Sequence, residues 1–489
     1  MITITPKQDY DCDVLIIGGG PSGSGLAFHL ASKGIRVIVA EAEKFPRDKV
    51  CGDGVSPIAV NELHKMGITE IAKFKEANEI TQVGLFINED KVYIDLSKPE
   101  YLPLHARVIP RLVLDNLIFE TAKNAGAEYL ENTRFVRYII NKETAITTLK
   151  SGDRSFEICS KVLVGADGSS SAVARQLHGS KSSDQFQLLG LRAYYEEVKG
   201  QGTRGDIFFS KESFPGIYWM FPRGNNGANI GMAMVSATIP HRPSNVKQML
   251  QKHIENNKEI VARIGHGRQE GKILGWPITF FNASSKISGN RIMLLGDAAG
   301  LINPLSGDGI QYALLSARWA SEVLEDCVNK NNFSENQMYI FRKKVEQELA
   351  YDFAFSHFLV QFARNKHFSK LWMEIIATLV GRAKKDKKYA DTIAGIFEGT
   401  YPSYNALTMD FIIKSLLQGG VRGVDALDAL TKNPKDALDF PNQFLTAMIE
   451  LLKRDNFYVD DQLKWLSSVI NKGLSVAGHT LNHVLSKKQ

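Results

Sequence analysis

The chain has few cysteines and no long apolar segment. Its 489 residues include four cysteines, which are far apart and form no C-x-x-C pair, namely Cys12, Cys51, Cys159 and Cys327. This excludes a disulfide-rich scaffold, argues against a metal site or a dithiol redox pair, and favours a reducing, cytoplasmic setting. No run approaches the roughly 18 apolar residues that a membrane-spanning helix needs. Any membrane contact is therefore expected to be peripheral.

An excess of one charge is also lacking. Lys and Arg total 59 and Asp and Glu total 53, which gives a net charge of +6, and the basic residues form no long run. Nucleic acid is therefore not an expected partner. No secretory signal is expected, since residues 1–13 carry Asp11 and Asp13 and lack a basic start and a long apolar stretch.

The length and composition are those of a globular protein with two to three domains. Hydrophobic residues make up 44% of the chain and charged residues 23%. Near the N-terminus, the apolar run Val14–Ile17 is followed by a helical pattern that includes Leu26 and Leu30, and then by a second run at Val37–Val39. This order predicts a βαβ unit.

Later segments predict a second sheet and a helical C-terminal part. Strand-like stretches recur after residue 80 and again between Leu189 and Val235, which indicates a mostly antiparallel sheet inserted into the nucleotide-binding fold. A buried strand at Arg291–Leu295 and a helix starting near Gly307 return to that fold. Beyond about residue 340, apolar residues recur at helical spacing.

These patterns predict an α/β protein with three domains. The Rossmann-type nucleotide-binding domain is expected to comprise residues 1–85, 105–180 and 286–340. The substrate-binding sheet domain is expected at 86–104 and 181–285, and the helical domain at 341–489.

A glycine-rich turn predicts a dinucleotide site. Gly18-Gly19-Gly20-Pro21-Ser22-Gly23 satisfies G-x-G-x-x-G and lies between the first strand and the helix. Gly18 permits a tight turn, Gly20 lets backbone N–H groups approach a pyrophosphate, and Gly23 lets the helix pack closely on the strand. Glu41 ends the second strand, where its carboxylate can accept hydrogen bonds from a ribose.

Two later segments indicate which dinucleotide binds. The first ends a strand with Asp167-Gly168-Ser169, and the second runs from Gly296-Asp297 to Gly307-Asp308-Gly309-Ile310. These residues resemble the flavin hydroxylase superfamily, and the resemblance implies that the cofactor is FAD. It places the first segment near the pyrophosphate, Asp297 on the ribityl chain, and the helix after Gly307, Gly309 and Ile310 with its N-terminus toward the flavin ring.

A longer motif identifies a branch of this superfamily. Phe45-Pro46-Arg47-Asp48-Lys49-Val50-Cys51-Gly52-Asp53-Gly54-Val55-Ser56-Pro57 resembles the geranylgeranyl reductase family, which includes menaquinone-reducing members, and the likeness covers about residues 10–340. It implies that Cys51 and Gly52 lie near the isoalloxazine and that Arg111 contacts FAD. Cys51 could serve chemistry or simply pack, since a small thiol often does.

The strand Pro215-Gly216-Ile217-Tyr218-Trp219-Met220-Phe221-Pro222 resembles the Tyr-x-Trp-x-Phe-Pro segment that lines the prenyl cavity in those reductases. Ile217 stands where the family has tyrosine. Because successive strand residues face opposite sides, we expect Ile217, Trp219 and Phe221 to share a substrate-binding face and Tyr218 to point away. Trp219 and Tyr218 join Cys51 as catalytic candidates.

The resemblance implies a reductase that transfers hydride from reduced flavin to C=C bonds of an isoprenoid, such as a geranylgeranyl lipid or menaquinone. An external donor (NAD(P)H, ferredoxin or a flavin reductase) would reduce the FAD. A flavin-dependent monooxygenase or halogenase acting on an aromatic or apolar small molecule is the alternative, and a non-enzymatic flavin-binding scaffold is a third reading. Lys384-Lys385 and Lys387-Lys388, close to the apolar segment Leu371–Val380, would suit peripheral membrane contact.

Overall fold

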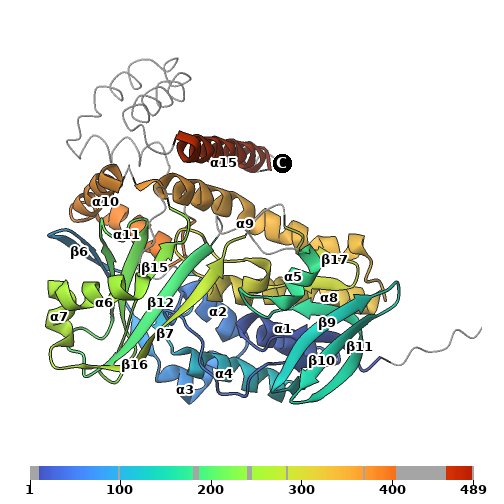
Figure 1. Cartoon of the computed structure of the whole chain (residues 1–489). Coiled ribbons are helices and arrows are strands. Elements are labelled where there is room, and N and C mark those ends of the chain that lie inside the picture. Colours follow the sequence, from blue (N-terminus) through green and yellow to red (C-terminus); the bar gives the residue numbers. More distant parts are fainter. Residues whose placement is uncertain are drawn as a thin grey trace, which may run out of the picture. The chain divides into compact units, whose positions relative to one another are not determined.

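The computed structural model describes residues 10–96, 100–179, 187–238, 245–281, 285–366, 369–402 and 459–486. The chain divides into two compact units (Figure 1). Unit 1 comprises Met1–Glu79, Glu100–Gly190 and Leu274–Ala350, and unit 2 comprises Ile80–Pro99, Leu191–Ile273 and Tyr351–Gln489. The predicted α/β fold with an inserted sheet and a helical C-terminal region is confirmed. The exact division into three domains stays a prediction.

A parallel sheet forms the centre of unit 1. Its strands run in the order β18-β11-β1-β2-β8 and are all parallel; they are β1 (Cys12–Ile17), β2 (Val37–Ala40), β8 (Glu128–Leu130), β11 (Arg154–Gly165) and β18 (Ile292–Leu294). Every residue of β1 is buried, as expected for a strand covered on both faces. Ile17 pairs with both Ala40 and Gly165, so the turns that follow these three strands leave the sheet at one edge.

Three helices pack together beside this sheet. The first, α1 (Pro21–Ala31), contacts both α4 (Arg111–Asn124) and α8 (Ile310–Asn329). Gly25 permits close packing of α1 on α8, because a Cβ there would lie 3.3 Å from the Ala317 Cβ. The sequence placed the start of the third of these helices, α8, near Gly307. The helix begins at Ile310, with Gly309 as its N-cap.

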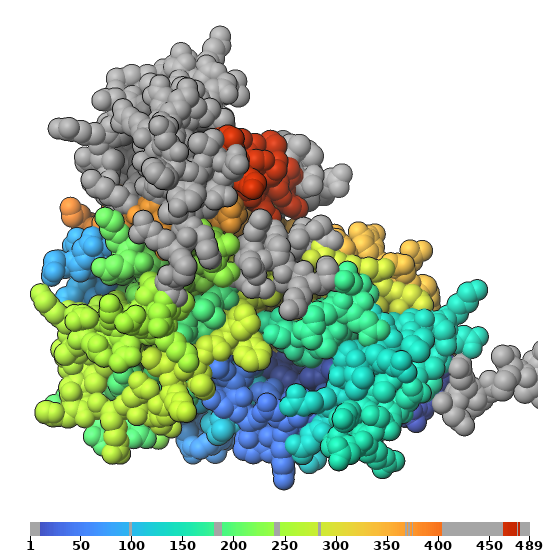
Figure 2. Space-filling model, viewed as in Figure 1, coloured from blue at the N-terminus to red at the C-terminus, as the bar shows by residue number. Residues whose placement is uncertain are grey.

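Smaller elements complete unit 1. The hairpin β9–β10 extends the sheet from β11, and its outer surface lies in the teal region of Figure 2. A three-stranded sheet has the order β3-β7-β4, and α2 packs on α8. The bounds are β3 (Gly54–Val55), α2 (Pro57–Lys65), η1 (Ile68–Glu70), α3 (Ala72–Lys75), β4 (Asn78–Ile80), β7 (Ala106–Val108), β9 (Thr133–Ile140), β10 (Ala145–Ser151), α5 (Ala172–His178), β17 (Ser288–Gly289) and η3 (Gly296–Ala299).

The second sheet has the order β16-β12-β15-β14-β13-β5-β6. The pairs β13–β14, β14–β15 and β5–β6 are antiparallel, and β13–β5 is parallel. The bounds are β5 (Gln82–Ile87), β6 (Asp90–Asp95), β12 (Gln187–Glu196), β13 (Arg204–Phe209), β14 (Gly216–Pro222), β15 (Ala228–Val235) and β16 (Arg268–Thr279). Helices α6 (Val246–Asn256) and α7 (Lys258–Ile264) follow β15.

The C-terminal region is helical where it is described. Its helices are α9 (Glu335–Ala363), α10 (Ser369–Ala383), α11 (Lys387–Phe397) and α15 (Val459–Ser486). Trp465 of α15 is fully buried beside Phe358, Phe362 and Trp372, and its Nε1 donates to the Gln361 carbonyl at 2.8 Å. Residues 403–458 of the predicted helical domain lie outside the described residues. Among the described helices, we find none with the length and apolarity to cross a bilayer.

Candidate functional site

The turn after β1 has the form expected of a pyrophosphate cradle. Gly18 has φ +99°, in the left-handed region that favours glycine, and a Cβ there would lie 2.4 Å from the Ala166 oxygen. At Gly20 a Cβ would meet no atom closer than Arg47 Nη2 at 3.6 Å. Gly20 is the N-cap of α1 and makes no side-chain cap hydrogen bond, and Pro21 opens the helix. Ser22 and Gly23 lie buried in its first turn.

Glu41 is held at the end of β2 by the same turn. Its Oε2 accepts a hydrogen bond from the Gly19 N–H at 2.8 Å, and its Oε1 accepts one from the Glu43 N–H at 3.0 Å. The residue is only 6% exposed. A buried carboxylate fixed at the carboxyl end of the second strand suits the ribose-binding role predicted from the sequence.

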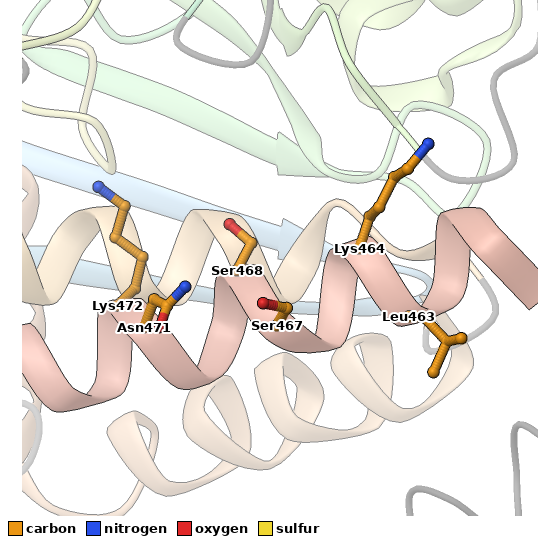
Figure 3. Close-up of a pocket in the computed structure, with 6 residues that line it drawn as sticks. All are labelled: Leu463, Lys464, Ser467, Ser468, Asn471 and Lys472. Atoms are coloured by element: carbon orange, nitrogen blue, oxygen red, sulfur yellow. The ribbon is translucent and has the colours of Figure 1, made fainter.

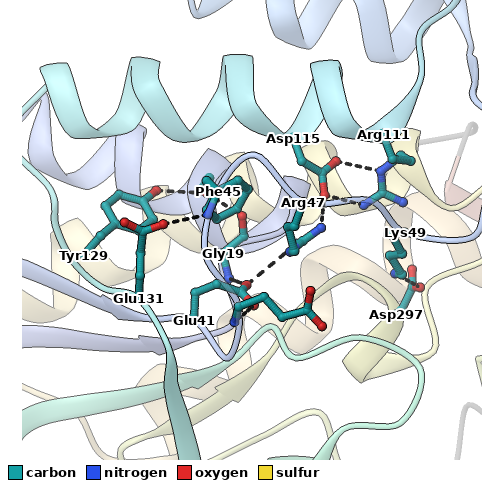
Figure 4. Close-up of polar contacts among 12 residues, drawn as sticks. Gly19, Glu41, Phe45, Arg47, Lys49, Arg111, Asp115, Tyr129, Glu131 and Asp297 are labelled. Carbon is teal, nitrogen blue, oxygen red and sulfur yellow. Dashed lines mark hydrogen bonds and ion pairs between the residues drawn. The ribbon is translucent and has the colours of Figure 1, made fainter. Parts of the chain in front are cut away.

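A buried ion-pair network extends from Glu41 toward Arg111 (Figure 4). Arg111 donates to Asp115 in a bidentate manner, with Nε at 2.6 Å from Oδ1 and Nη2 at 2.8 Å from Oδ2. Arg47 Nη1 also donates to Asp115 Oδ2, at 2.8 Å, while its Nη2 lies 3.7 Å from Glu41 Oε2. Burial raises the pKa of Asp115, but Arg111 and then Arg47 lower that pKa more, so the carboxylate stays ionised.

Asp297 is the centre of a second polar group. Its Oδ2 accepts from Lys49 Nζ at 3.2 Å and from Ser169 Oγ at 3.0 Å. Burial raises the pKa of Asp297, but Lys49, followed by the Arg111 charge and the Ser169 hydrogen bond, together lower it more and hold that pKa below its usual range. A Cβ at Gly309 would lie 3.3 Å from Asp297 Oδ1, so this carboxylate also faces the start of α8.

Asp167 takes part in local structure. Its Oδ1 accepts from Ser171 Oγ at 2.5 Å and its Oδ2 accepts from the Ala172 N–H at 2.7 Å, at the N-terminus of α5. Gly168 has φ +77° and allows the turn. A cofactor contact by Asp167 therefore stays a prediction, and the side-chain geometry favours a role in fixing the turn.

The loop before α8 contributes a buried carboxyl group. Gly307 has φ +71°, and Asp308 Oδ1 accepts from the Gln311 N–H at 3.3 Å. Burial raises the pKa of Asp308 to about 6, although hydrogen bonds partly offset this effect. Gly309 caps α8 without a side-chain hydrogen bond and Ile310 opens it, so this helix end presents backbone N–H groups.

The Cys51-Gly52-Asp53 segment lies in the same unit. Burial raises the pKa of Cys51, and the nearby Arg111 charge lowers it less, so the thiol stays protonated at neutral pH. Cys51 packs against the buried cluster that includes Leu63 and Ile310. This environment favours packing over a nucleophilic thiolate.

The predicted substrate residues lie on β14 in unit 2. The rings of Trp219 and Phe221 stack at 6.2 Å between centroids, while Tyr218 stacks on His253 of α6 at 3.6 Å. The predicted alternation of faces is thus confirmed. Trp219 Nε1 donates to Asn229 Oδ1 at 2.9 Å, and a Cβ at Gly231 would lie 2.2 Å from the Trp219 ring. Ile217 is partly buried.

A separate cavity of about 580 Å³ lies along α15 in unit 2 (Figure 3). Its lining among the described residues is mostly polar and includes none of the predicted site residues: Leu463, Lys464, Ser467, Ser468, Asn471 and Lys472. Burial lowers the pKa of Lys472.

The structure thus brings the predicted cofactor residues together in unit 1 and the predicted substrate residues together on β14. Arg47, Lys49, Asp115 and Ser169 contact the predicted cofactor residues but were not themselves predicted to bind the cofactor. All four lie within or beside motifs that were recognised. Their pairing was not visible in the sequence because the partners are far apart along the chain, by 68 residues for Arg47 and Asp115 and by 248 for Lys49 and Asp297.

These residues fit FAD. The open space over Gly20, the helix ends capped by Gly20 and Gly309, and the fixed carboxylates of Glu41 and Asp297 supply the donors and acceptors that an adenine dinucleotide with a ribityl chain requires. FAD would supply hydride-transfer chemistry at this site.

Comparisons with known proteins agree with this geometry. The family model described as FAD binding domain matches residues 11–324. The menaquinone reductase of Mycobacterium tuberculosis (strain ATCC 25618 / H37Rv) is 30% identical over 338 residues, which are 65% of this chain and 77% of that protein. The digeranylgeranylglycerophospholipid reductase of Thermoplasma acidophilum is 26% identical over 342 residues, 68% of this chain and 83% of that protein.

Solved structures show the same fold. A geranylgeranyl bacteriochlorophyll reductase-like protein from Thermoplasma acidophilum has a TM-score of 0.62 at 22% identity, covering 86% of this chain and 99% of that one. The flavin-dependent halogenase CmlS has a TM-score of 0.61 at 18% identity, covering 76% and 73%. The chain therefore belongs to the FAD-binding domain family, and it is an FAD-dependent oxidoreductase related to the geranylgeranyl and menaquinone reductases.

Proposed function

We propose that this flavoprotein reduces C=C bonds in the isoprenoid chain of a geranylgeranyl lipid or a menaquinone-type quinone. The observation that carries the proposal is the 30% identity to a menaquinone reductase over 338 residues. The relatives support an apolar small-molecule substrate. The identity of the isoprenoid chain and of its head group is part of the proposal. An external donor (NAD(P)H, ferredoxin or a flavin reductase) would reduce the cofactor, and peripheral membrane contact would give access to a lipid substrate.

The residues of each unit suit separate parts of this task. In unit 1, Asp297 and the start of α8 would orient FAD, and the partial positive charge at the helix N-terminus would favour negative charge on the reduced ring. In unit 2, Ile217, Trp219 and Phe221 form an apolar face of β14 that could bind a prenyl chain. Asp308, whose pKa is raised to about 6, is a carboxyl group that can hold a proton near neutral pH.

The test is anaerobic turnover of the dithionite-reduced full-length protein with geranylgeranyl lipids and with menaquinone. Product mass and flavin absorbance are recorded together. A product with two extra hydrogens in its isoprenoid chain, formed as the flavin is reoxidised, is the expected result. For menaquinone the product is reoxidised in air before its mass is read, because reduction of the quinone ring to the quinol also adds two hydrogens. Flavin that stays reduced with every isoprenoid tested would contradict the proposal.

A halogenase or monooxygenase is the second candidate, because flavin-dependent halogenases share this fold. The sequence gives no clear position for a catalytic lysine of this second candidate: Lys73, Lys75 and Lys91 each form an ion pair with a glutamate at an exposed position. This environment favours a surface role for them. Reoxidation only after oxygen is admitted, with an oxygenated or halogenated product, would support the second candidate.

A further inference from the structure

The Lys49 ammonium lies beside two segments of the predicted dinucleotide site. Its Nζ lies 3.2 Å from Asp297 Oδ2, and a Cβ at Gly168 would lie 3.7 Å from the same nitrogen. The ammonium is therefore next to the turn that follows β11 and to the turn that follows β18. These are the two segments that the family resemblance places along FAD.

The other two cations of the site are already committed. Arg111 makes a bidentate pair with Asp115 and its side chain is 4% exposed; Arg47 pairs with Asp115 and Glu41 and is 11% exposed. The Lys49 side chain is 26% exposed, and Asp297 is its ion-pair partner among the described residues. An ammonium group has three N–H donors, so one contact with Asp297 leaves donor capacity for a ligand.

The charges of this cluster balance before any ligand is counted. Arg47, Lys49 and Arg111 face the carboxylates of Glu41, Asp115 and Asp297. The pyrophosphate of FAD adds negative charge on both phosphates. The helix N-terminus at Gly20 offers only about half a positive charge. Arg47, the nearest side chain over Gly20, is already paired with carboxylates, so the partly exposed Lys49 ammonium beside Gly168 is the group with donors left to stabilise the added charge.

We propose that Lys49 is a further cofactor-binding residue whose ammonium bridges the Asp297 carboxylate and the pyrophosphate of FAD. One donor stays with Asp297 and a second is donated to a phosphate oxygen. Ser169 Oγ holds the same Asp297 oxygen from the other side. The proposal concerns cofactor binding alone, so it holds whichever substrate the enzyme uses.

The test compares FAD with ADP, which has the pyrophosphate but no ribityl chain or flavin ring. The full-length protein is deflavinated, FAD binding is followed by flavin fluorescence, and ADP binding is measured by displacement of FAD. Lys49→Met is expected to weaken both ligands by about 10- to 100-fold, the range for a lost charge-assisted hydrogen bond. Lys49→Arg should retain most of the affinity. Raising the salt concentration should weaken ligand binding less in Lys49→Met than in the parent, because the variant lacks the charge that salt screens.

Lys33→Met is the matched control, since Lys33 pairs with Glu325 in the same unit at a partly exposed position. It should leave both affinities unchanged. Circular dichroism of each variant checks folding. If Lys49→Met does not fold, Lys49→Gln is used for the same titrations.

A double-mutant cycle with Asp297→Asn separates a direct contact from a neutralising role. If Lys49 binds the phosphate, Lys49→Met still weakens ADP in the Asp297→Asn background. If Lys49 only neutralises Asp297, Lys49→Met has no effect on ADP in that background, and the proposal is overturned. Loss of FAD affinity with unchanged ADP affinity in the single variant overturns it as well.

Discussion

At the scale of single residues, Gly23 is the position where a side chain has least room. A Cβ there would lie 1.9 Å from the Gly18 backbone oxygen and 3.3 Å from the Ala166 Cβ. Gly23→Ala must therefore displace α1 from the turn after β1. We expect the free energy of unfolding to fall by about 3 kcal/mol and FAD affinity to fall at least about tenfold, as measured by urea unfolding and fluorescence titration.

Gly381 is the matched control. It lies within α10, and a Cβ there would meet no atom within 4 Å. Gly381→Ala should therefore raise stability by about 0.5–1 kcal/mol, because alanine favours the helix, and leave FAD affinity unchanged. Equal effects of the two substitutions on stability and FAD affinity would show that the tight packing at Gly23 does not determine either quantity.

Asp308 makes stability depend on pH. Burial raises its pKa from 3.8 to about 6 in the folded protein, so the folded state binds the proton more tightly than the unfolded state. The stabilisation is fully present below pH 3.8 and is lost as the pH rises through about 6. Asp308→Asn should therefore gain stability relative to the parent between pH 4 and pH 7, by up to about 3 kcal/mol, measured by urea unfolding of the flavin-free protein.

Asp326→Asn, near the C-terminal end of α8, offers a comparison. Asp326 pairs with Lys330 at the exposed end of α8, and its substitution should change stability by no more than about 1 kcal/mol at each pH. A stability difference for Asp308→Asn that stays constant from pH 4 to pH 7 would contradict the proposed proton binding.

At the scale of elements, β14 has two faces with different neighbours. Phe221 stacks on Trp219 on one face, and Tyr218 stacks on His253 on the other. If the first face binds the prenyl chain, Phe221→Ala should lower kcat/KM for a prenylated substrate about tenfold, mainly through KM, and leave FAD affinity unchanged. Steady-state kinetics with reduced protein measure this effect.

Tyr218→Ala is the control from the opposite face. Tyr218 is 2% exposed, so its removal should cost about 3–5 kcal/mol of stability while KM for the prenylated substrate stays the same. An increase of KM with Tyr218→Ala and none with Phe221→Ala would place the substrate on the Tyr218 face of β14 and contradict the proposal.

The elements were predictable where a local pattern determines them. The glycine turn, the strand predicted at Val14–Ile17 and the alternation along β14 follow from neighbouring residues, and each is confirmed, with the strand extending back to Cys12. The start of α8 was predicted only as near Gly307; that glycine has φ +71° and belongs to the preceding turn, and the helix begins at Ile310. A helix start is set by capping geometry, which composition alone does not give.

The ion pairs of the site could not be predicted in the same way. Arg47 and Lys49 follow each other closely in one motif, yet they bind different carboxylates, Asp115 and Asp297. Only the parallel sheet, which brings the ends of several strands to one edge, joins these groups. The sequence therefore identified the segments of the cofactor site but not the contacts that hold its charges.

At the scale of the whole molecule, the two units contain different parts of the proposed function. The predicted cofactor residues belong to unit 1, while β14 and the helical region from Tyr351 onward belong to unit 2. Trp465 anchors α15 to α9 within unit 2, through its buried ring and its hydrogen bond to Gln361. None of the contacts described for Trp465 involves a residue of the dinucleotide site.

Trp465→Ala should therefore separate stability of the C-terminal region from cofactor binding. Loss of a fully buried indole costs about 3–5 kcal/mol, so limited proteolysis should cleave the C-terminal region of the variant faster than that of the parent. FAD affinity should stay within about twofold, because effects of substitutions without shared partners are independent. A large loss of FAD affinity would instead show that α15 is coupled to unit 1, and the helical region would then belong to the cofactor site.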